Sequence, residues 1–256
     1  MYIVWALAQP VSPAPPAPMT ISSADIKSFA RSKGADLVGI ANTAAFAKYP
    51  EERRPEKLLA DAKSVIVVGV RVLADTVKPN LLLSALHHIT LNLYHNQIAY
   101  DVGRYLDDLG HAAAVVPHRI GNIDAEMRTS PNYMHTYPLL FALSTRHAAV
   151  EAGLGILGKS RLLLTNRFGP RQRLAAVVTD VELQPDPPVS AEDAEHLCPA
   201  ACVACMRACP GEAISKEGLD WAKCNTVIKP HNGLYGYSAC SECMVSCPTS
   251  RRRPAG

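Results

Sequence analysis

The pattern of apolar and polar residues predicts alternating helices and strands along the first two thirds of the chain. Residues 22–33 carry apolar side chains at helical spacing, which predicts an amphipathic helix. Apolar runs over residues 36–41 and 64–73 predict two strands. The second run is apolar along most of its length, which is typical of a central strand that is covered on both faces.

The same pattern continues with one long helix and several shorter elements. Residues 81–109 have a helical pattern, and residues 112–116 predict a short strand. A helix is expected over residues 138–151, followed by strands at 161–165 and 173–179. Alternating helices and strands indicate a layered domain of the α/β (α+β) class.

Two stretches of biased composition divide the chain into three parts. Residues 1–18 are apolar and then rich in Pro and Ala, and we expect a disordered extension with Met19 as the natural start. A run rich in Pro, Asp and Ser over residues 182–191 predicts a linker. We therefore expect a layered domain at 19–185 and a cysteine-rich domain at 186–256.

Composition narrows the class of protein. The 256 residues are 48% apolar and 19% charged, enough apolar material for a substantial core. Apolar runs stay well short of the roughly 20 residues that a membrane span needs, so we expect a cytoplasmic protein with no membrane partner.

All eight cysteines lie between Cys198 and Cys247. The run C-x2-C-x3-C-P occurs twice and is typical of bacterial ferredoxins, in which the cysteine before proline ligates the other [4Fe-4S] cluster. The spacing therefore predicts two clusters. One cluster takes Cys198, Cys202, Cys205 and Cys247, and the other takes Cys209, Cys224, Cys240 and Cys243.

Two other uses of the cysteines remain open. A disulfide knot would need a secretory signal, and residues 1–9 lack a basic region. Zinc ribbons have similar CxxC knuckles but rarely use C-x2-C-x3-C-P twice. The gap from Cys198 to Cys202 holds three residues where ferredoxins have two, and we expect a local bulge there. Two bound clusters would bring the formal net charge from +3 to about −1, so the mild basicity does not indicate nucleic acid.

Four segments between the predicted helix and the cysteines resemble a known family. They are Glu151–Lys159 (EAGLGILGK), Leu162–Thr165, Arg167–Arg171 (RFGPR) and Leu174–Asp180. These segments are similar to the core of epoxyqueuosine reductases and of the related reductive dehalogenases. The likeness covers about residues 20–250.

The resemblance implies a nitroreductase-like domain that holds cobalamin beside the nearer cluster, followed by a ferredoxin-like two-cluster domain. The glycines near residue 155 would let a large planar ligand approach the backbone, or would simply form a helix C-cap and a tight turn. The basic and hydroxyl side chains would bind polar groups of the ligand, or be solvated. The residues expected at the cofactor are Gly153, Leu154, Gly155, Gly158, Lys159, Ser160, His147 and Arg171.

The sequence also departs from the family. Epoxyqueuosine reductases have a catalytic Asp where this chain has His135, which can donate a proton near neutral pH. Tyr133 and Tyr137 are further candidate acids. The chain ends at Gly256 without the helical repeats that help those enzymes hold tRNA, so we expect a small-molecule substrate rather than tRNA.

Polar and aromatic residues of the long predicted helix have simpler interpretations. His88 and His95 lack a cysteine or carboxylate partner and are expected on the helix surface. Tyr94 and Tyr100 are expected in the core or in a homodimer contact.

Three hypotheses for function follow. The first is an oxidoreductase that takes electrons from a ferredoxin- or flavodoxin-type donor through two clusters to cobalamin. The second is an iron–sulfur flavoenzyme that binds FMN in the same fold. The third is a non-catalytic electron-transfer or cofactor-handling partner.

Overall fold

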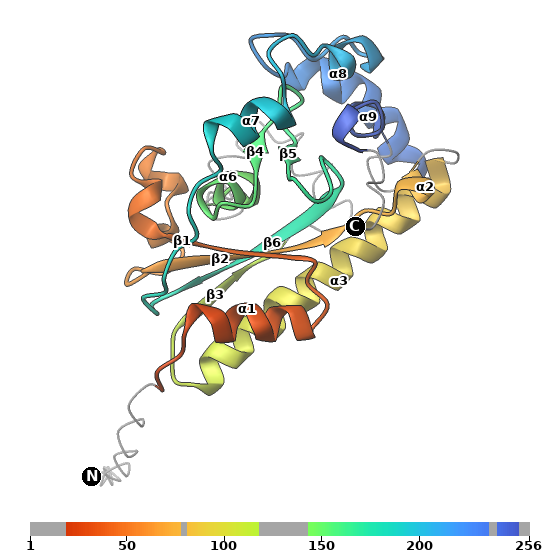
Figure 1. The fold of residues 1–256 in the computed structure, drawn as a ribbon. Coiled ribbons are helices and arrows are strands. Elements are labelled where there is room, and N and C mark those ends of the chain that lie inside the picture. Colours follow the sequence, from red (N-terminus) through yellow and green to blue (C-terminus); the bar gives the residue numbers. More distant parts are fainter. Residues whose placement is uncertain (1–18, 78–80, 118–142, 236–239, 251–256) are drawn as a thin grey trace, which may run out of the picture.

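The computed structural model describes residues 19–77, 81–117, 143–235 and 240–250. Within these residues helices pack on both faces of a four-stranded sheet (Figure 1). All its described strand pairs are antiparallel, in the order β1-β2-β6-β3. The strands are β1 (Leu37–Asn42), β2 (Ser64–Arg71), β6 (Gln172–Thr179) and β3 (Ala113–Val116).

Strand β2 is the central strand that its apolar run predicts. It lies between β1 and β6, with Val68 opposite Val38 on one side and Ala175 on the other. Every residue of β2 except Arg71 is buried. Alternate residues along β2 and β6 belong to two separate core clusters, one on each face of the sheet.

Helices of different length cover the two faces. Helices α1 (Ser23–Ser32) and α3 (Leu81–Asp108) cover one face, and α6 (Thr145–Glu151) covers the other (Figure 1). Ser22 begins α1 with a capping box, because its side chain accepts from the Asp25 backbone while the Asp25 carboxylate accepts from Ser22.

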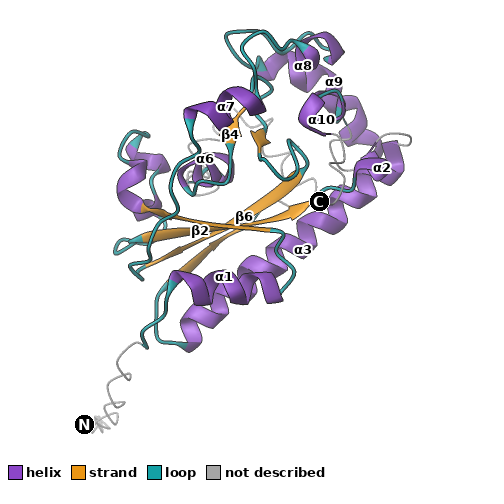
Figure 2. Cartoon of the chain, in the orientation of Figure 1, coloured by secondary structure: helices purple, strands orange, loops and turns teal. Residues whose placement is uncertain are grey.

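The cysteine-rich segment lies together at the top of the view in Figure 2. It contains α7 (Ala191–Leu197), α8 (Ala204–Ala208), α9 (Trp221–Tyr235) and α10 (Glu242–Val245). Smaller elements are α2 (Ala74–Val77), β4 (Ile156–Leu157), β5 (Leu163–Leu164) and the 3-10 turns Thr43–Phe46, Glu51–Arg53, Pro55–Lys57 and Pro248–Ser250.

The predicted linker over residues 182–191 has no regular structure, yet it is anchored to the sheet. The Asp186 carboxylate accepts from the Ile40 backbone at 2.9 Å and pairs with Lys27. The Asp186 backbone N–H donates to the Ile40 carbonyl at 2.8 Å. The cysteine-rich segment therefore starts from a fixed point on β1.

The structure confirms most predicted elements and corrects two. The helix expected over 138–151 begins only at Thr145, because the Ser144 side chain caps its first turn; residues 138–142 lie outside the described ranges. The strand expected over 161–165 shrinks to Leu163–Leu164, because Arg161 adopts a positive φ of 58° and interrupts the extended backbone.

The faces of α3 differ from the prediction. His88 and His95 were expected on the surface but are 1% and 0% exposed. Tyr94 and Tyr100 are 45% and 55% exposed, so they are not core residues. The helix carries no charged residue before Asp101. Charged side chains usually indicate which face of a helix is exposed, so the exposed face of α3 could not be predicted. Although α3 is long, no helix among the described residues has the length and apolar character to cross a bilayer.

Candidate functional site

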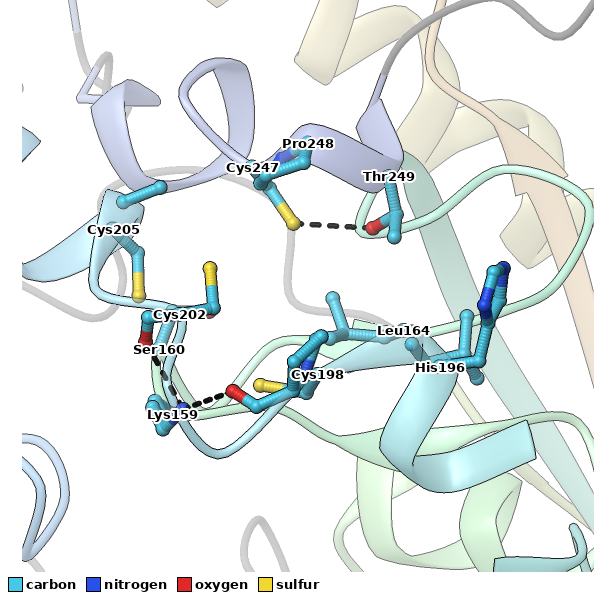
Figure 3. A pocket seen from close by; sticks show the side chains of 13 residues that line it. Lys159, Ser160, Leu164, His196, Cys198, Cys202, Cys205, Cys247, Pro248 and Thr249 are labelled. Carbon is cyan, nitrogen blue, oxygen red and sulfur yellow. Dashed lines mark hydrogen bonds between the residues drawn. The ribbon is translucent and has the colours of Figure 1, made fainter. Parts of the chain in front are cut away.

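Four cysteines surround a cavity of about 230 Å³ at the edge of the cysteine-rich segment. Cys198 follows α7, Cys202 lies in the next loop, Cys205 is in α8, and Cys247 precedes the last 3-10 turn. Figure 3 shows the sulfurs of Cys202 and Cys247 pointing into the space between these segments. Segments far apart in sequence thus bring together the set that the cysteine spacing assigns to one cluster.

These four thiols influence one another's ionisation. Burial raises the pKa of the Cys205 thiol, and the neighbouring Cys198, Cys247 and Cys202 raise it further. Four thiolates this close would repel one another, so they need a cationic partner to be anionic near neutral pH.

The remaining four cysteines form a second group. Burial raises the pKa of the Cys243 thiol to about 12, and the next largest causes are Cys240 and Cys224. Burial also raises the pKa of Cys224, followed by Cys240 and Cys209. Cys205 of the first group contributes to the raised pKa of Cys243, which indicates that the two groups adjoin.

The donor set is of the kind that cysteine-ligated metal centres use. All eight cysteines are free thiols, and four of them line one cavity. Cysteine thiolates ligate iron–sulfur clusters and also structural zinc. The chemistry of these side chains therefore fits a metal centre held by cysteines.

Lys159 fixes the loop that contains the additional residue. Its Nζ donates to the carbonyls of Pro199, Ala200 and Cys202 at 2.6, 2.9 and 3.0 Å. The Ala200 backbone N–H in turn donates to Glu195 Oε1 at 2.9 Å. The sequence analysis expected Lys159 to bind a ligand's polar groups or to be solvated. In the structure its ammonium instead holds the Cys198–Cys202 loop.

Arg171 holds the segment that follows Cys247. Its buried guanidinium donates from Nε to the Ser250 carbonyl at 2.6 Å and from a terminal nitrogen to the Val72 carbonyl at 2.7 Å. At Gly169, a Cβ would lie 2.3 Å from the Thr249 carbonyl oxygen. The turn at 167–171 thus packs against the segment that follows Cys247.

Gly153 is explained by helix termination. Its φ is +68°, its N–H donates to the Val150 carbonyl, and the Leu154 N–H donates to the Ala149 carbonyl. These two bonds form a Schellman C-cap of α6. A Cβ at Gly153 would also lie 2.2 Å from the Pro187 carbonyl oxygen.

The other glycines of the loop also face the chain itself. A Cβ at Gly155 would lie 2.1 Å from the Leu164 carbonyl oxygen, and one at Gly158 would lie 2.7 Å from Leu164 Cδ1. The Leu154 side chain packs against Gly39 of β1. The C-cap and tight turn therefore account for the glycine loop, and the planar-ligand interpretation gains no support from it.

The other predicted cofactor residues lie apart from one another. Ser160 is buried and lines the cysteine cavity. His147 is half-buried on α6, with its ring edge-on to Tyr49 at 5.1 Å between centroids. Burial lowers the pKa of His147, and the nearby arginines, first Arg146, lower it further. The Tyr49 hydroxyl donates to the Glu151 carboxylate at 2.6 Å.

Some residues of the site escaped the sequence analysis, and some predictions cannot be placed. Leu164, His196 and Thr249 line the cavity, and Thr249 Oγ1 lies 3.1 Å from Cys247 Sγ. His196 and Thr249 are each two residues from a cysteine, which is the signal that could have found them. The candidate catalytic residues lie outside the described ranges; these are His135, Tyr133 and Tyr137.

Sequence comparison finds two groups of relatives. The chain is 38% identical over 116 residues to tetrachloroethene reductive dehalogenase of Desulfitobacterium hafniense, covering 39% of this chain and 21% of that protein. It is 32% identical over 123 residues to epoxyqueuosine reductase of Listeria monocytogenes, covering 43% of this chain and 30% of that protein. The aligned part thus spans between a fifth and a third of these relatives. No family model matches the chain.

Structure comparison finds the same two groups. A catabolic reductive dehalogenase in complex with 3-bromo-4-hydroxybenzoic acid matches with a TM-score of 0.66 and 21% identity, over 89% of this chain and 32% of that one. An epoxyqueuosine reductase bound to a tRNA stem loop matches with a TM-score of 0.58 and 18% identity, over 89% of this chain and 64% of that one. The chain is therefore related in sequence and fold to the superfamily of reductive dehalogenases and epoxyqueuosine reductases.

Proposed function

We propose that this protein is an oxidoreductase that passes single electrons through two [4Fe-4S] clusters to a corrinoid for a low-potential reduction. The observation that carries the proposal is the cavity lined by Cys198, Cys202, Cys205 and Cys247, the four free thiols that the cysteine spacing assigns to one cluster. Two clusters in series would supply one-electron transfer at low potential. Such a path suits a reductase, which is also the activity in the names of both groups of relatives.

The chain's own residues would position the first cluster. Cys198, Cys202, Cys205 and Cys247 would be its ligands. Lys159 holds the loop between the first two of them, and Arg171 holds the segment beyond the last. Partial burial raises the pKa of the Cys243, Cys240 and Cys224 thiols and favours their neutral form until iron binds.

The corrinoid part of the proposal is supported by the relatives. B12-dependent dehalogenation is described for one reductive dehalogenase that matches this chain with a TM-score of 0.64. The glycines of the loop are explained by contacts with the chain itself, so they add no separate support for a corrinoid. Two of the predicted corrinoid contacts, Lys159 and Ser160, line the cysteine cavity.

The substrate could belong to either of two classes. The relatives include a dehalogenase bound to a small aromatic halide and an epoxyqueuosine reductase bound to a tRNA stem loop. The second finding counts against the expectation that tRNA is excluded. We propose a small-molecule substrate, reduced with electrons from a ferredoxin- or flavodoxin-type donor and protonated by His135.

Anaerobic turnover assays test this function. The protein, supplied with cobalamin and a reduced low-potential donor, is incubated with 3-bromo-4-hydroxybenzoic acid, tetrachloroethene or an epoxyqueuosine-containing tRNA stem loop. Halide release that is lost in Cys243→Ala and His135→Ala would support the proposal. Reduction of the stem loop alone would move the substrate to tRNA. Redox-active clusters without turnover on any substrate would favour an electron-transfer partner, and a yellow, cobalt-free enzyme would favour the FMN alternative.

A further inference from the structure

We propose that the exposed face of α3 binds a second copy of this chain. This inference does not depend on the proposed reductase function, because it uses exposed residues of α3, none of which lines the cysteine cavity. It commits to a symmetric pairing of one α3 with another.

The face is an apolar stripe with coiled-coil spacing. Its members alternate by three and four residues along α3, which is the heptad repeat of helices that pack lengthwise. The large side chains among them are between 49% and 55% exposed. The stripe consists of Leu83, Leu86, Thr90, Leu93, Gln97 and Tyr100.

The opposite face of α3 is buried and mixes apolar core residues such as Leu91 and Ile98 with polar ones. It buries Ser84, His88, Asn92 and His95, all at 1% exposure or less. His88 lies between two partners, with Arg173 Nε donating to its Nδ1 at 3.3 Å and Ser241 Oγ 3.4 Å from its Nε2. These contacts fix the rotation of the helix, so the leucines cannot turn inward.

Charge indicates what covers the stripe. Residues 81–100 contain no Asp, Glu, Lys or Arg. A helix that lies on a membrane carries Lys and Arg on its polar face, and a docking site for a charged redox protein carries complementary charges. An uncharged stripe instead meets its own copy without repulsion, as a two-fold interface requires.

The size of the stripe sets the expected strength. From Leu83 to Tyr100 the helix rises by about 26 Å, at about 1.5 Å per residue. A single helix pair of that length buries less than the roughly 800 Å² per partner of a standard interface. We therefore expect a reversible dimer with a dissociation constant on the order of micromolar.

Sedimentation velocity of the iron-loaded chain tests the proposal, across a concentration series on the order of 1 to 100 µM that brackets this affinity. The wild type should shift from monomer to dimer. Leu86→Glu with Leu93→Glu should remain monomeric throughout, because the new carboxylates face each other. Leu73→Glu is the matched control, since Leu73 is 49% exposed but lies outside α3; this variant should dimerise like the wild type.

Three outcomes would overturn the proposal: a wild type that stays monomeric throughout, a dimer that survives the double substitution, or a dimer that Leu73→Glu also abolishes. Unchanged helicity and iron content show that the double variant is folded; if it is not, Leu93→Gln takes its place with the same expectation in weaker form. Co-sedimentation with phosphatidylcholine–phosphatidylglycerol vesicles is a parallel arm. Vesicle binding by a monomeric wild type would assign the stripe to a membrane surface and contradict the dimer.

Discussion

Lys159 shows how one side chain can accommodate a change in cysteine spacing. A lysine ammonium has three donors, and Lys159 Nζ lies within hydrogen-bond distance of three carbonyls in or beside the Cys198–Cys202 loop. The loop holds one residue more than the ferredoxin pattern, and Lys159 binds the carbonyls of two of its three residues, Pro199 and Ala200. A single cation thereby orders a longer loop beside the first group of thiols.

Replacing the Lys159 ammonium should destabilise the loop that carries two proposed ligands of the first cluster. In Lys159→Met the stem remains but all three charge-assisted bonds are lost, and we expect a loss of about 2 kcal/mol of stability. Iron content should fall toward half, because only one group of cysteines depends on this loop. Iron analysis and anaerobic thermal unfolding measure both effects. Lys48→Met is the matched control, since Lys48 is 62% exposed and pairs with Glu151 away from the cysteines; full iron and an unchanged Tm in Lys159→Met would contradict the assigned role.

His95 makes stability depend on pH. Burial is the main cause that lowers its pKa from 6.5 to about 4, so the folded chain keeps the ring neutral where the unfolded chain protonates it. Stability should therefore fall as pH decreases from about 6.5 toward 4, and should be about 2 kcal/mol lower at pH 5 than at pH 7. Thermal unfolding across this range should show a shallower pH dependence in His95→Gln than in the wild type. An equally steep dependence in the variant would assign the effect to other groups.

At the scale of elements, helices and strands with a clear apolar pattern in the sequence were predicted correctly, and those without one were predicted only in part. Strand β2 and helix α1 have one-sided or fully apolar patterns and formed where expected. The faces of α3 could not be assigned, because a helix without charges offers no marker of the solvent side. The start of α6 depends on the Ser144 cap, and the short β5 depends on the positive φ of Arg161; neither feature appears in an apolar pattern.

The end of α6 yields a test of the glycine loop. In Gly153→Ala, the alanine would have to keep a φ of +68°, which residues with a Cβ disfavour. Its Cβ would also lie 2.2 Å from the Pro187 carbonyl oxygen. We expect a loss of about 2 to 3 kcal/mol from the combined backbone strain and steric overlap. Thermal unfolding measures the loss. Gly103→Ala is the comparison: inside α3 its Cβ would meet one methyl of Val115 at 2.7 Å rather than a backbone carbonyl, it has no positive φ, and alanine favours the helix. A Gly153→Ala variant as stable as Gly103→Ala would contradict the C-cap interpretation.

At the scale of the molecule, the segments that carry the family resemblance meet the cysteines. Lys159 and Arg171 precede the cysteine-rich segment in sequence, yet Lys159 holds the loop between Cys198 and Cys202 and Arg171 holds the segment after Cys247. The spacing of the cysteines pointed to the four that line the cavity, because ligands of a cluster follow a local pattern. The roles of Lys159, Arg171 and the glycines depend on contacts between distant segments, which a single sequence does not reveal.

The most direct test of the account is the metal content of protein purified anaerobically from cells supplied with cobalamin. Two four-thiol groups that serve a corrinoid predict about eight iron and about one cobalt per chain, with little zinc. Zinc in place of iron would contradict the cluster assignment, and eight iron without cobalt would contradict electron transfer to a corrinoid.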